Sequence, residues 1–265
     1  MVDNNKEKKI ILITGANSGI GLDTAHALAS ASADNHVIMA CRDKSKGQTA
    51  LESLKSSSST SSSGGGGALL GTLSLLELDV TNDDSISAAV TTVTSEFGRL
   101  DVLINNAGMM NIKPTDRRAD LLSTYNTNAA SALILTEHML PLLKKSADPR
   151  IINVSSGLGS VTEKSDPGSQ YYAVPGEPYR MSKAAMNMAA ACMYASYKSW
   201  GCKVWSFDPG FVVTNLSGAE NRDRRVSMGA ESSETSAKGL REIVEGVRDG
   251  DVGKFVGREG VTLPW

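Results

Sequence analysis

The sequence predicts an α/β fold, a doubly wound Rossmann-type parallel sheet of about seven strands with helices on both faces, formed by a single domain over residues 1–265. Two observations support this prediction. Short, nearly continuous apolar segments alternate with longer amphipathic segments, and this alternation occurs six times. The apolar segments are rich in Ile, Val and Leu and are bounded by Gly, Asn, Asp or Pro, which is typical of strands buried on both faces and joined by right-handed crossovers.

Each element follows from this alternation. We expect strands at residues 9–14, 36–41, 72–79, 100–106, 150–156 and 202–208, and a seventh at 254–257. We expect helices at residues 20–33, 43–54, 83–97, 116–145, 179–200 and about 234–248. Residues 56–67 contain only Ser, Thr and Gly. Because such a segment buries no apolar surface, we expect a flexible loop there.

Composition and charge argue against several classes of protein. Twenty-seven basic and 29 acidic residues give a net charge of −2, so the chain has no electrostatic reason to bind nucleic acid. Its longest apolar stretches fall far short of the roughly 20 residues of a membrane span, and residues 1–9 resemble neither a signal nor a transit peptide. Cys41, Cys192 and Cys202 lack metal-ligand spacing. We therefore expect free thiols in the cytoplasm, no membrane segment and no metal site.

A glycine-rich turn follows the first strand directly and opens the first helix. Residues 14–21 read TGANSGIG. Glycines there allow a sharp turn and a close approach to a pyrophosphate, and the helix N-terminus offers N–H groups to the phosphates. The turn predicts dinucleotide binding, although a tight turn without a ligand remains an alternative. An ATP-binding phosphate loop is disfavoured because no Lys-Ser or Lys-Thr follows the glycines.

The end of the second strand bears on the choice of dinucleotide. Arg42 lies 21 residues after Gly21. An acidic residue at about this distance binds the ribose of NAD, whereas an arginine accommodates the 2′-phosphate of NADP. Arg42 predicts NADP, with Lys44 or Lys46 assisting. Asp43 is the competing residue and favours NAD, but a carboxylate there also suits the start of a helix.

Tyr179 and Lys183 are spaced four residues apart, which places both on one face of a helix. An ammonium group beside a phenol stabilises the phenolate and lowers the tyrosine pKa. A phenol with a pKa of ~10 is protonated at neutral pH and can donate a proton to a carbonyl. Acting as a base would require the pKa to fall by ~3 units, about 4 kcal/mol. Such pairs also occur on solvated helix faces, so the neighbouring residues decide the interpretation.

Polar residues follow three further strands, at the carboxyl edge where open α/β sheets bind ligands. They are Asn105 and Asn106, Ser155 and Ser156, and Asp208. A serine hydroxyl there can bond to a substrate carbonyl, although a serine that only caps a turn is an alternative. Asn128 lies in the middle of a predicted helix, where Asn is unfavourable unless it is exposed or has a polar partner.

Together these residues resemble the short-chain dehydrogenase/reductase family in its single-domain form, from residue 9 to about residue 257. The resemblance rests on TGANSGIG at 14–21, NNAG at 105–108, Pro209-Gly210 with Thr214, and the ordered set Asn128, Ser156, Tyr179 and Lys183. Residues 39–43 look most like those of NADP-preferring carbonyl reductases and of retinol-dehydrogenase-like members.

The resemblance implies a role for each matched residue. Tyr179 would protonate a carbonyl oxygen or deprotonate an alcohol, and Lys183 would hold the nicotinamide ribose and tune Tyr179. Ser156 would bond to the reacting oxygen, with Ser155 as its rival, and Asn128 would hold a water in a proton relay to Lys183. NADPH would be bound by Gly15, Asn17, Ser18, Gly19, Ile20, Gly21, Arg42, Asp79, Val80, Asn106, Ala107, Gly108, Tyr179, Lys183, Pro209, Gly210, Val212 and Thr214.

The chain also departs from the family pattern. Ser156 and Tyr179 are 23 residues apart, more than is usual, so residues of about 164–178 are expected to form an insertion beside the active site. The insertion would shape the pocket or obstruct a helix-packed dimer interface, which leaves a dimer, a tetramer and a monomer open. Ser18 stands where many NADP-using relatives have a basic residue, so Arg42 would carry most of the selectivity.

We therefore expect an NADPH-dependent oxidoreductase that reduces a ketone or aldehyde of a moderately apolar small molecule by hydride transfer, with Tyr179 as the general acid. Residues of about 215–233 would form the substrate lid. One alternative is an NAD(P)-dependent alcohol dehydrogenase working in the oxidative direction. Another is a catalytically silent NADP-binding regulatory module, which is disfavoured because binding alone needs no acid–base group.

Overall fold

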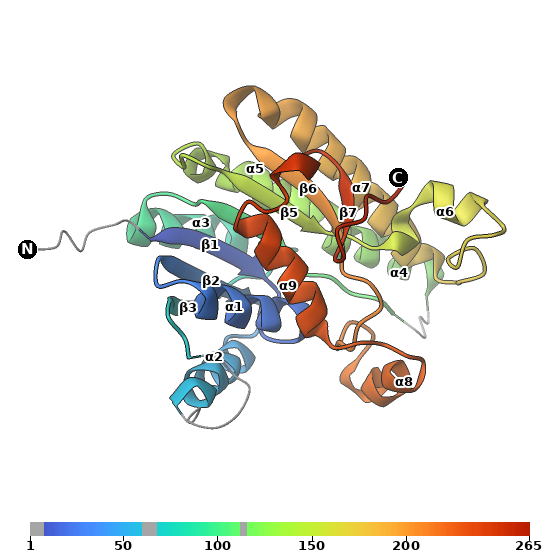
Figure 1. The fold of residues 1–265 in the computed structure, drawn as a ribbon, viewed down its shortest axis with the longest axis horizontal. Helices are drawn as coiled ribbons and strands as arrows, with labels where there is room; N and C mark the ends of the chain where they lie inside the picture. Colours follow the sequence, from blue (N-terminus) through green and yellow to red (C-terminus); the bar gives the residue numbers. More distant parts are fainter. Residues whose placement is uncertain (1–7, 60–67, 112–115) are drawn as a thin grey trace, which may run out of the picture.

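A computed structural model describes residues 8–59, 68–111 and 116–265 of the chain. Its centre is a parallel sheet of seven strands in the order β3-β2-β1-β4-β5-β6-β7 (Figure 1). The strands are β1 (Lys9–Thr14), β2 (Asn35–Cys41), β3 (Thr72–Glu77), β4 (Val102–Asn105), β5 (Arg150–Val154), β6 (Lys203–Asp208) and β7 (Phe255–Gly257). The predicted fold class is confirmed. The strand order reverses between β1 and β4, where open sheets form their ligand crevice.

Helices cover both faces of this sheet. They are α1 (Gly19–Ala31), α2 (Lys44–Ser59), α3 (Asp83–Phe97), α4 (Arg117–Tyr125), α5 (Ser131–Leu143), α6 (Val161–Ser165), α7 (Glu177–Tyr197), α8 (Arg222–Ser227) and α9 (Ser233–Val244). Residues of α1, α2 and α9 form one core with Ile11 and Ile13, whereas residues of α3, α5 and α7 form the other with Leu12. Successive side chains of a strand point to opposite faces, so burial on both faces explains the continuous apolar runs.

Helix α3 shows how local sequence sets the ends of an element. The Asn82 side chain accepts a hydrogen bond from the Ser85 backbone N–H at 2.8 Å, which satisfies a donor in the first turn. Asp83 and Asp84 add negative charge at the positive end of the helix dipole. Gly98 ends the helix in the left-handed region, with φ of 70°. These signals are all local, and the helix has the predicted bounds.

Two helices differ from the prediction. Helix α2 continues to Ser59, four residues into the expected loop, because extending an existing helix fixes only one residue at a time. The rest of that loop, residues 60–67, lies outside the described residues. The expected helix over 116–145 is divided into α4 and α5 by a π-helical turn, Asn126–Ala130. The Asn126 carbonyl accepts from the backbone N–H of Ser131 and also from its hydroxyl, the latter at 2.7 Å.

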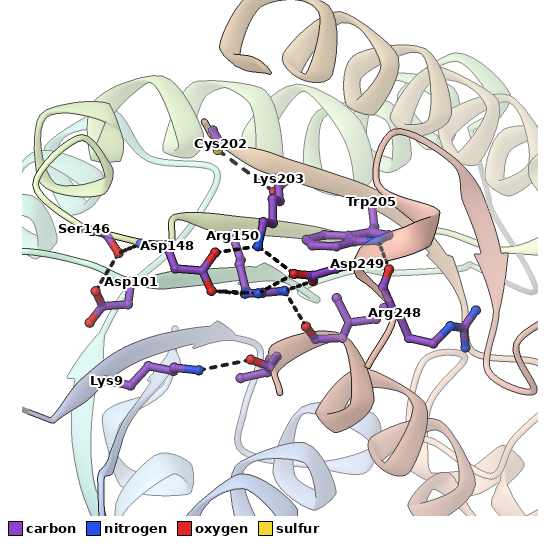
Figure 2. Close-up of polar contacts among 12 residues, drawn as sticks. Lys9, Asp101, Ser146, Asp148, Arg150, Cys202, Lys203, Trp205, Arg248 and Asp249 are labelled. Atoms are coloured by element: carbon purple, nitrogen blue, oxygen red, sulfur yellow. Dashed lines mark hydrogen bonds and ion pairs between the residues drawn. The ribbon is translucent and has the colours of Figure 1, made fainter. Parts of the chain in front are cut away.

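The edge of the sheet where β5 and β6 begin carries a network of ion pairs (Figure 2). The Arg150 side chain, 3% exposed, donates to Asp148 at 2.6 Å and to Asp249 at 2.5 Å. Lys203 bonds to the same two carboxylates, at 2.8 and 2.6 Å. The network joins the two strands to the segment after α9. It lies at the opposite end of these strands from Ser156 and Asp208.

Candidate active site

The glycine turn after β1 and the loop after β4 are bonded to each other. The Thr14 hydroxyl accepts hydrogen bonds from the backbone N–H groups of Asn106 and Ala107, each at 2.9 Å. The Asn106 amide donates to the Thr14 carbonyl at 2.8 Å. These contacts place two of the predicted motifs side by side, at the point where the strand order reverses.

The glycines of this turn are required by its geometry. Gly15 and Gly19 have φ values of 65° and 53°, a region that side chains other than glycine rarely adopt. A Cβ atom at Gly21 would lie 2.6 Å from the Asn106 amide nitrogen, and one at Gly19 would lie 3.2 Å from the Thr214 side chain. The bare backbone in front of α1 is a cradle that fits the pyrophosphate of a nicotinamide dinucleotide.

The predicted adenosine-side residues lie after β2 and β3. Arg42 is exposed at the end of β2, and Asp79 and Val80 are half-buried after β3. The Asp79 carboxylate accepts two hydrogen bonds from Thr81, at 2.9 and 2.7 Å. Burial acts to raise the pKa of Asp79, but the Thr81 bonds and the charge of Arg42 outweigh it and lower this pKa. Arg42 and Asp79 therefore lie close enough to interact.

Tyr179 lies in the first turn of α7 and is 8% exposed. The Ser156 hydroxyl is within hydrogen-bonding reach of its phenol. Burial raises the pKa of Tyr179 to about 12, although the Ser156 contact and the charge of Arg225 act to lower it. Ser155 instead donates to the Lys183 backbone carbonyl at 3.3 Å. Of the two serines, Ser156 is therefore the one beside the phenol.

Lys183 lies one turn after Tyr179 and is also buried, at 3% exposure. Its Nζ donates to the Val154 carbonyl at 2.8 Å and lies 5.7 Å from the centre of the Tyr179 ring. Burial lowers the pKa of Lys183 to about 8. Burial therefore outweighs the opposing effects on the Tyr179 phenol, and the expectation that Lys183 tunes its pKa with the cofactor bound stays a prediction.

Asn128 is fully buried in the π-helical turn. Its Oδ1 accepts from the Met109 backbone N–H at 2.7 Å, and its Nδ2 donates to the Met109 carbonyl and to the Ser182 hydroxyl, both at 2.9 Å. Ser182 in turn donates to the Tyr179 carbonyl at 2.7 Å. Asn128 thus joins the loop after β4 to helix α7. Among the described residues its side chain makes no hydrogen bond to Lys183.

The segment after β6 lies against the glycine turn. Pro209 accepts from the Ser236 hydroxyl at 2.7 Å through its carbonyl, and Gly210 has φ of 74°. Val212 and Thr214 are buried, and the Thr214 side chain packs against Gly19. The segment continues to Leu216, whose carbonyl accepts from the Met110 N–H at 3.2 Å. These contacts bring the segment after β6 together with the glycine turn and the loop after β4 at the carboxyl edge of the sheet.

The site contains residues that the sequence did not single out. Asp208, named there only as the end of a strand, accepts from the backbone N–H groups of Gly157 and Gly210 at 2.9 and 3.3 Å and so joins two loops. The Tyr171 ring covers Gly157, where a Cβ atom would lie 2.7 Å from it. Arg225 of α8 interacts electrostatically with Tyr179. Tyr171 and Arg225 could not be identified from the sequence around them, because their partners in the site, Gly157 and Tyr179, lie in other segments of the chain.

No group of three or more His, Cys, Asp or Glu side chains in the described parts of the chain could hold a metal ion. No helix in those parts is long and apolar enough to cross a membrane.

Comparison with known proteins supports the same interpretation. The short chain dehydrogenase family model matches residues 9–225. The chain is 33% identical over 273 residues to the short-chain dehydrogenase/reductase tropE of Talaromyces stipitatus, covering 98% of both proteins. It is 36% identical over 259 residues to the short-chain dehydrogenase anuI of Penicillium roqueforti, covering 95% of this chain and 93% of that protein.

Solved structures agree with these relatives. The NADPH-bound carbonyl reductase from chicken fatty liver superposes with a TM-score of 0.78 at 30% identity, covering 98% of this chain and 100% of that one. The carbonyl reductase Sniffer of D. melanogaster gives a TM-score of 0.77 at 28% identity, with the same coverage. The glycine turn, the Ser156–Tyr179–Lys183 arrangement and these matches together show that the chain belongs to the short-chain dehydrogenase/reductase family of oxidoreductases.

Proposed function

We propose that this protein is an NADPH-dependent carbonyl reductase that acts on a ketone or aldehyde of a moderately apolar small molecule. The observation that carries the proposal is the state of Tyr179. Its buried phenol, with a pKa raised to about 12, is protonated at neutral pH and has the Ser156 hydroxyl beside it. A protonated phenol is the form that reduction needs, because the carbonyl oxygen becomes an alcohol by gaining a proton.

In this proposal the two hydroxyl groups act on one substrate oxygen. Ser156 donates a hydrogen bond to the carbonyl oxygen and orients it, and Tyr179 gives that oxygen its proton. The cofactor, when bound, supplies the hydride. Lys183, whose Nζ donates to the Val154 carbonyl at 2.8 Å, would bind the nicotinamide ribose. Asn128 fixes the position of Met109 and so of the loop that borders the crevice.

The proposed NADPH site uses the crevice where the strand order reverses. The cradle of Gly15, Asn17, Ser18, Gly19, Ile20 and Gly21 would hold the pyrophosphate. Asp79 and Val80 would contact the adenine, and Arg42 would bind the 2′-phosphate. Asn106, Ala107, Gly108, Pro209, Gly210, Val212 and Thr214 would enclose the rest of the cofactor. The chicken carbonyl reductase, whose structure holds NADPH, offers a parallel for this choice of cofactor.

Removal of the phenolic oxygen tests the proposal. Tyr179→Phe is expected to reduce kcat for ketones and aldehydes by at least a hundredfold, since a positioned general acid contributes about 10²–10⁴-fold. NADPH affinity, measured by fluorescence titration, should change less than threefold. Tyr125→Phe, which removes an exposed phenol, is the matched control and should keep full activity. Retention of turnover by Tyr179→Phe would reject Tyr179 as the acid.

Two further properties belong to the proposal. We place the protein in the cytoplasm, a choice supported by Cys41, Cys192 and Cys202, all of which are free thiols. We also propose that residues 215–233 act as the substrate lid, because this segment contains α8 and is bonded to Met110 in the loop after β4.

A further inference from the structure

Helix α8 places one arginine against the segment after β6, within electrostatic reach of Tyr179. The helix lies in the segment after β6 and projects from the body of the molecule (Figure 1). Its sequence, RDRRVS, includes Arg222, Arg224 and Arg225. Arg222 and Arg224 are exposed, whereas Arg225 is half-buried. The three arginines therefore differ in what surrounds them.

The Arg225 side chain is held in place on two sides. Its Nε and Nη2 donate to the Val212 carbonyl at 3.0 and 2.8 Å. Its guanidinium carbon lies 4.9 Å from the centre of the Phe211 ring. A guanidinium bonded to a buried backbone and stacked on an aromatic face has a fixed position, so Arg225 presents its charge from a defined point in the site.

That charge has no counter-ion in the described residues. Arg225 forms no ion pair there, although Arg258 pairs with Glu231 and Arg248 with Asp251. Burial lowers the pKa of Arg225, and its charge in turn acts to lower the pKa of Tyr179. With no carboxylate beside it in the described residues, the half-buried guanidinium is free to donate a charge-assisted hydrogen bond to an anionic ligand.

We infer that Arg225 is a specificity-determining residue that binds an oxyanion of the substrate, a carboxylate or an ionised phenol or enol, in the same molecule as the carbonyl that is reduced. This inference rests on the proposed function. Exposed apolar side chains lie near Arg225 itself, since its ring partner Phe211 is 43% exposed and Val226 and Met228, in and after α8, are 56% and 62% exposed. The favoured substrate is then an apolar carbonyl compound with one negative charge.

A matched pair of substrates isolates the charge. 4-Formylbenzoate and its methyl ester have the same aldehyde and ring but differ by one carboxylate. The wild-type protein should reduce the acid with a kcat/KM at least tenfold above that of the ester. Arg225→Gln should lower kcat/KM for the acid by about 10–100-fold, the range expected for one hydrogen bond to a charged group. The ester should change less than threefold.

Two variants serve as controls. Arg224→Gln removes the same charge from the same helix at an exposed position and should leave the preference for the acid unchanged. Arg225→Lys keeps the charge without the planar fork and should retain part of the preference. Fluorescence titration with NADPH separates the two sources of an oxyanion, because weaker cofactor binding by Arg225→Gln would assign Arg225 to the cofactor phosphates and overturn the inference.

The remaining outcomes are equally decisive. Equal losses for acid and ester would make Arg225 a structural contact of α8, and an unchanged preference would remove it from the site; both overturn the inference. If the wild-type protein reduces no carbonyl compound with NADPH, the proposed function fails. The inference is then decided by calorimetric titration of the acid and the ester into the protein with NADP⁺. Tighter binding of the acid that is lost in Arg225→Gln supports it, and equal binding overturns it.

Discussion

At the scale of single residues, Arg42 bears most directly on the choice of cofactor. It is exposed at the end of β2, and its charge reaches Asp79 at the end of β3. The neighbouring Asp43 accepts from the Lys46 N–H at 3.0 Å and pairs with the Lys46 ammonium at 3.6 Å, so it serves the start of α2. This arrangement supports the proposal that Arg42 binds a 2′-phosphate.

Arg42→Asp is therefore expected to shift the preference from NADPH toward NADH. The change removes a cation and adds an anion that repels the phosphate but can bond to a ribose hydroxyl. The ratio of kcat/KM values for NADPH and NADH should fall by at least tenfold. Lys55→Asp makes the same change of charge at an exposed position of α2 and should leave the ratio unaltered. If both variants keep the wild-type ratio, Arg42 is not the phosphate ligand.

The residue-level motifs were readable from sequence because their signals are local. TGANSGIG, NNAG and the Tyr–Lys spacing lie in short windows, and the structure brings the first two into contact. The extent to which burial raises the pKa of Tyr179 could not be predicted, because burial depends on the whole surroundings of the phenol. Arg225 could not be identified from sequence, because RDRRVS looks like an ordinary solvated charge run.

At the scale of elements, several hydrogen bonds hold the segment between Ser156 and α7 in place. Arg180, 6% exposed, donates from Nη1 to the carbonyls of Tyr171 and Val174 at 3.0 and 3.2 Å. The Lys164 ammonium donates to the Tyr172 carbonyl at 2.7 Å. This segment includes the expected insertion, and its Tyr171 ring packs on Gly157 beside Ser156. We therefore expect it to form a fixed wall of the substrate pocket.

Arg180→Leu should loosen that wall, because it removes both bonds to the segment and leaves the two carbonyls without this donor. We expect KM for carbonyl substrates to rise severalfold with little change in NADPH affinity. Limited trypsin digestion should also cut after Lys164 faster than in the wild-type protein. Arg180→Lys, which retains a donor, should lie between the two. Unchanged cleavage after Lys164 in Arg180→Leu would show that Arg180 does not hold the segment.

Elements whose form depends on distant contacts were the hardest to predict. The sequence of 116–145 gives one long amphipathic pattern, yet Asn128 bonds to Met109 and Ser182, and the helix widens into a π-turn there. Neither partner belongs to that helix. By contrast, α3 has its caps within its own sequence and was predicted with the correct bounds.

At the scale of the whole molecule, ion pairs stabilise the edge of the sheet where β5 and β6 begin. Hydrogen bonds from Arg150 and Lys203 lower the pKa of Asp249 to about 2, although burial opposes the shift. A carboxylate whose pKa is depressed in the folded state stabilises the protein above its ordinary pKa, near 4, and this contribution is lost as the pH falls toward 2. The network should therefore matter at neutral pH and fade in acid.

Asp249→Asn is expected to lower Tm by a few degrees at pH 7, where about 1 kcal/mol corresponds to 2–4 °C for a chain of similar length. The difference from the wild-type protein should shrink steadily between pH 4 and pH 2.5. Glu96→Gln, at an exposed position of α3, controls for loss of a carboxylate. Differential scanning calorimetry across this range provides the measurement. A difference in Tm that stays constant with pH would contradict the assigned pKa.

The fold as a whole was predictable because the seven strands appear in the sequence as successive apolar runs, and their crossovers as the amphipathic segments between those runs. The strand order was not read from any single segment; it follows from how those runs pair.

One consequence of the Lys183 contact concerns which substitutions the site tolerates. The Lys183 ammonium donates its hydrogen bond to the backbone carbonyl oxygen of Val154. Every amino acid at position 154 would have the same backbone oxygen. A codon change at 154 can alter bulk in the core but cannot delete this acceptor. The hydrogen bond from Lys183 should therefore persist when Val154 is substituted by random mutagenesis. The sequences of α8 and of the segment around Tyr171 can meanwhile change to suit new substrates.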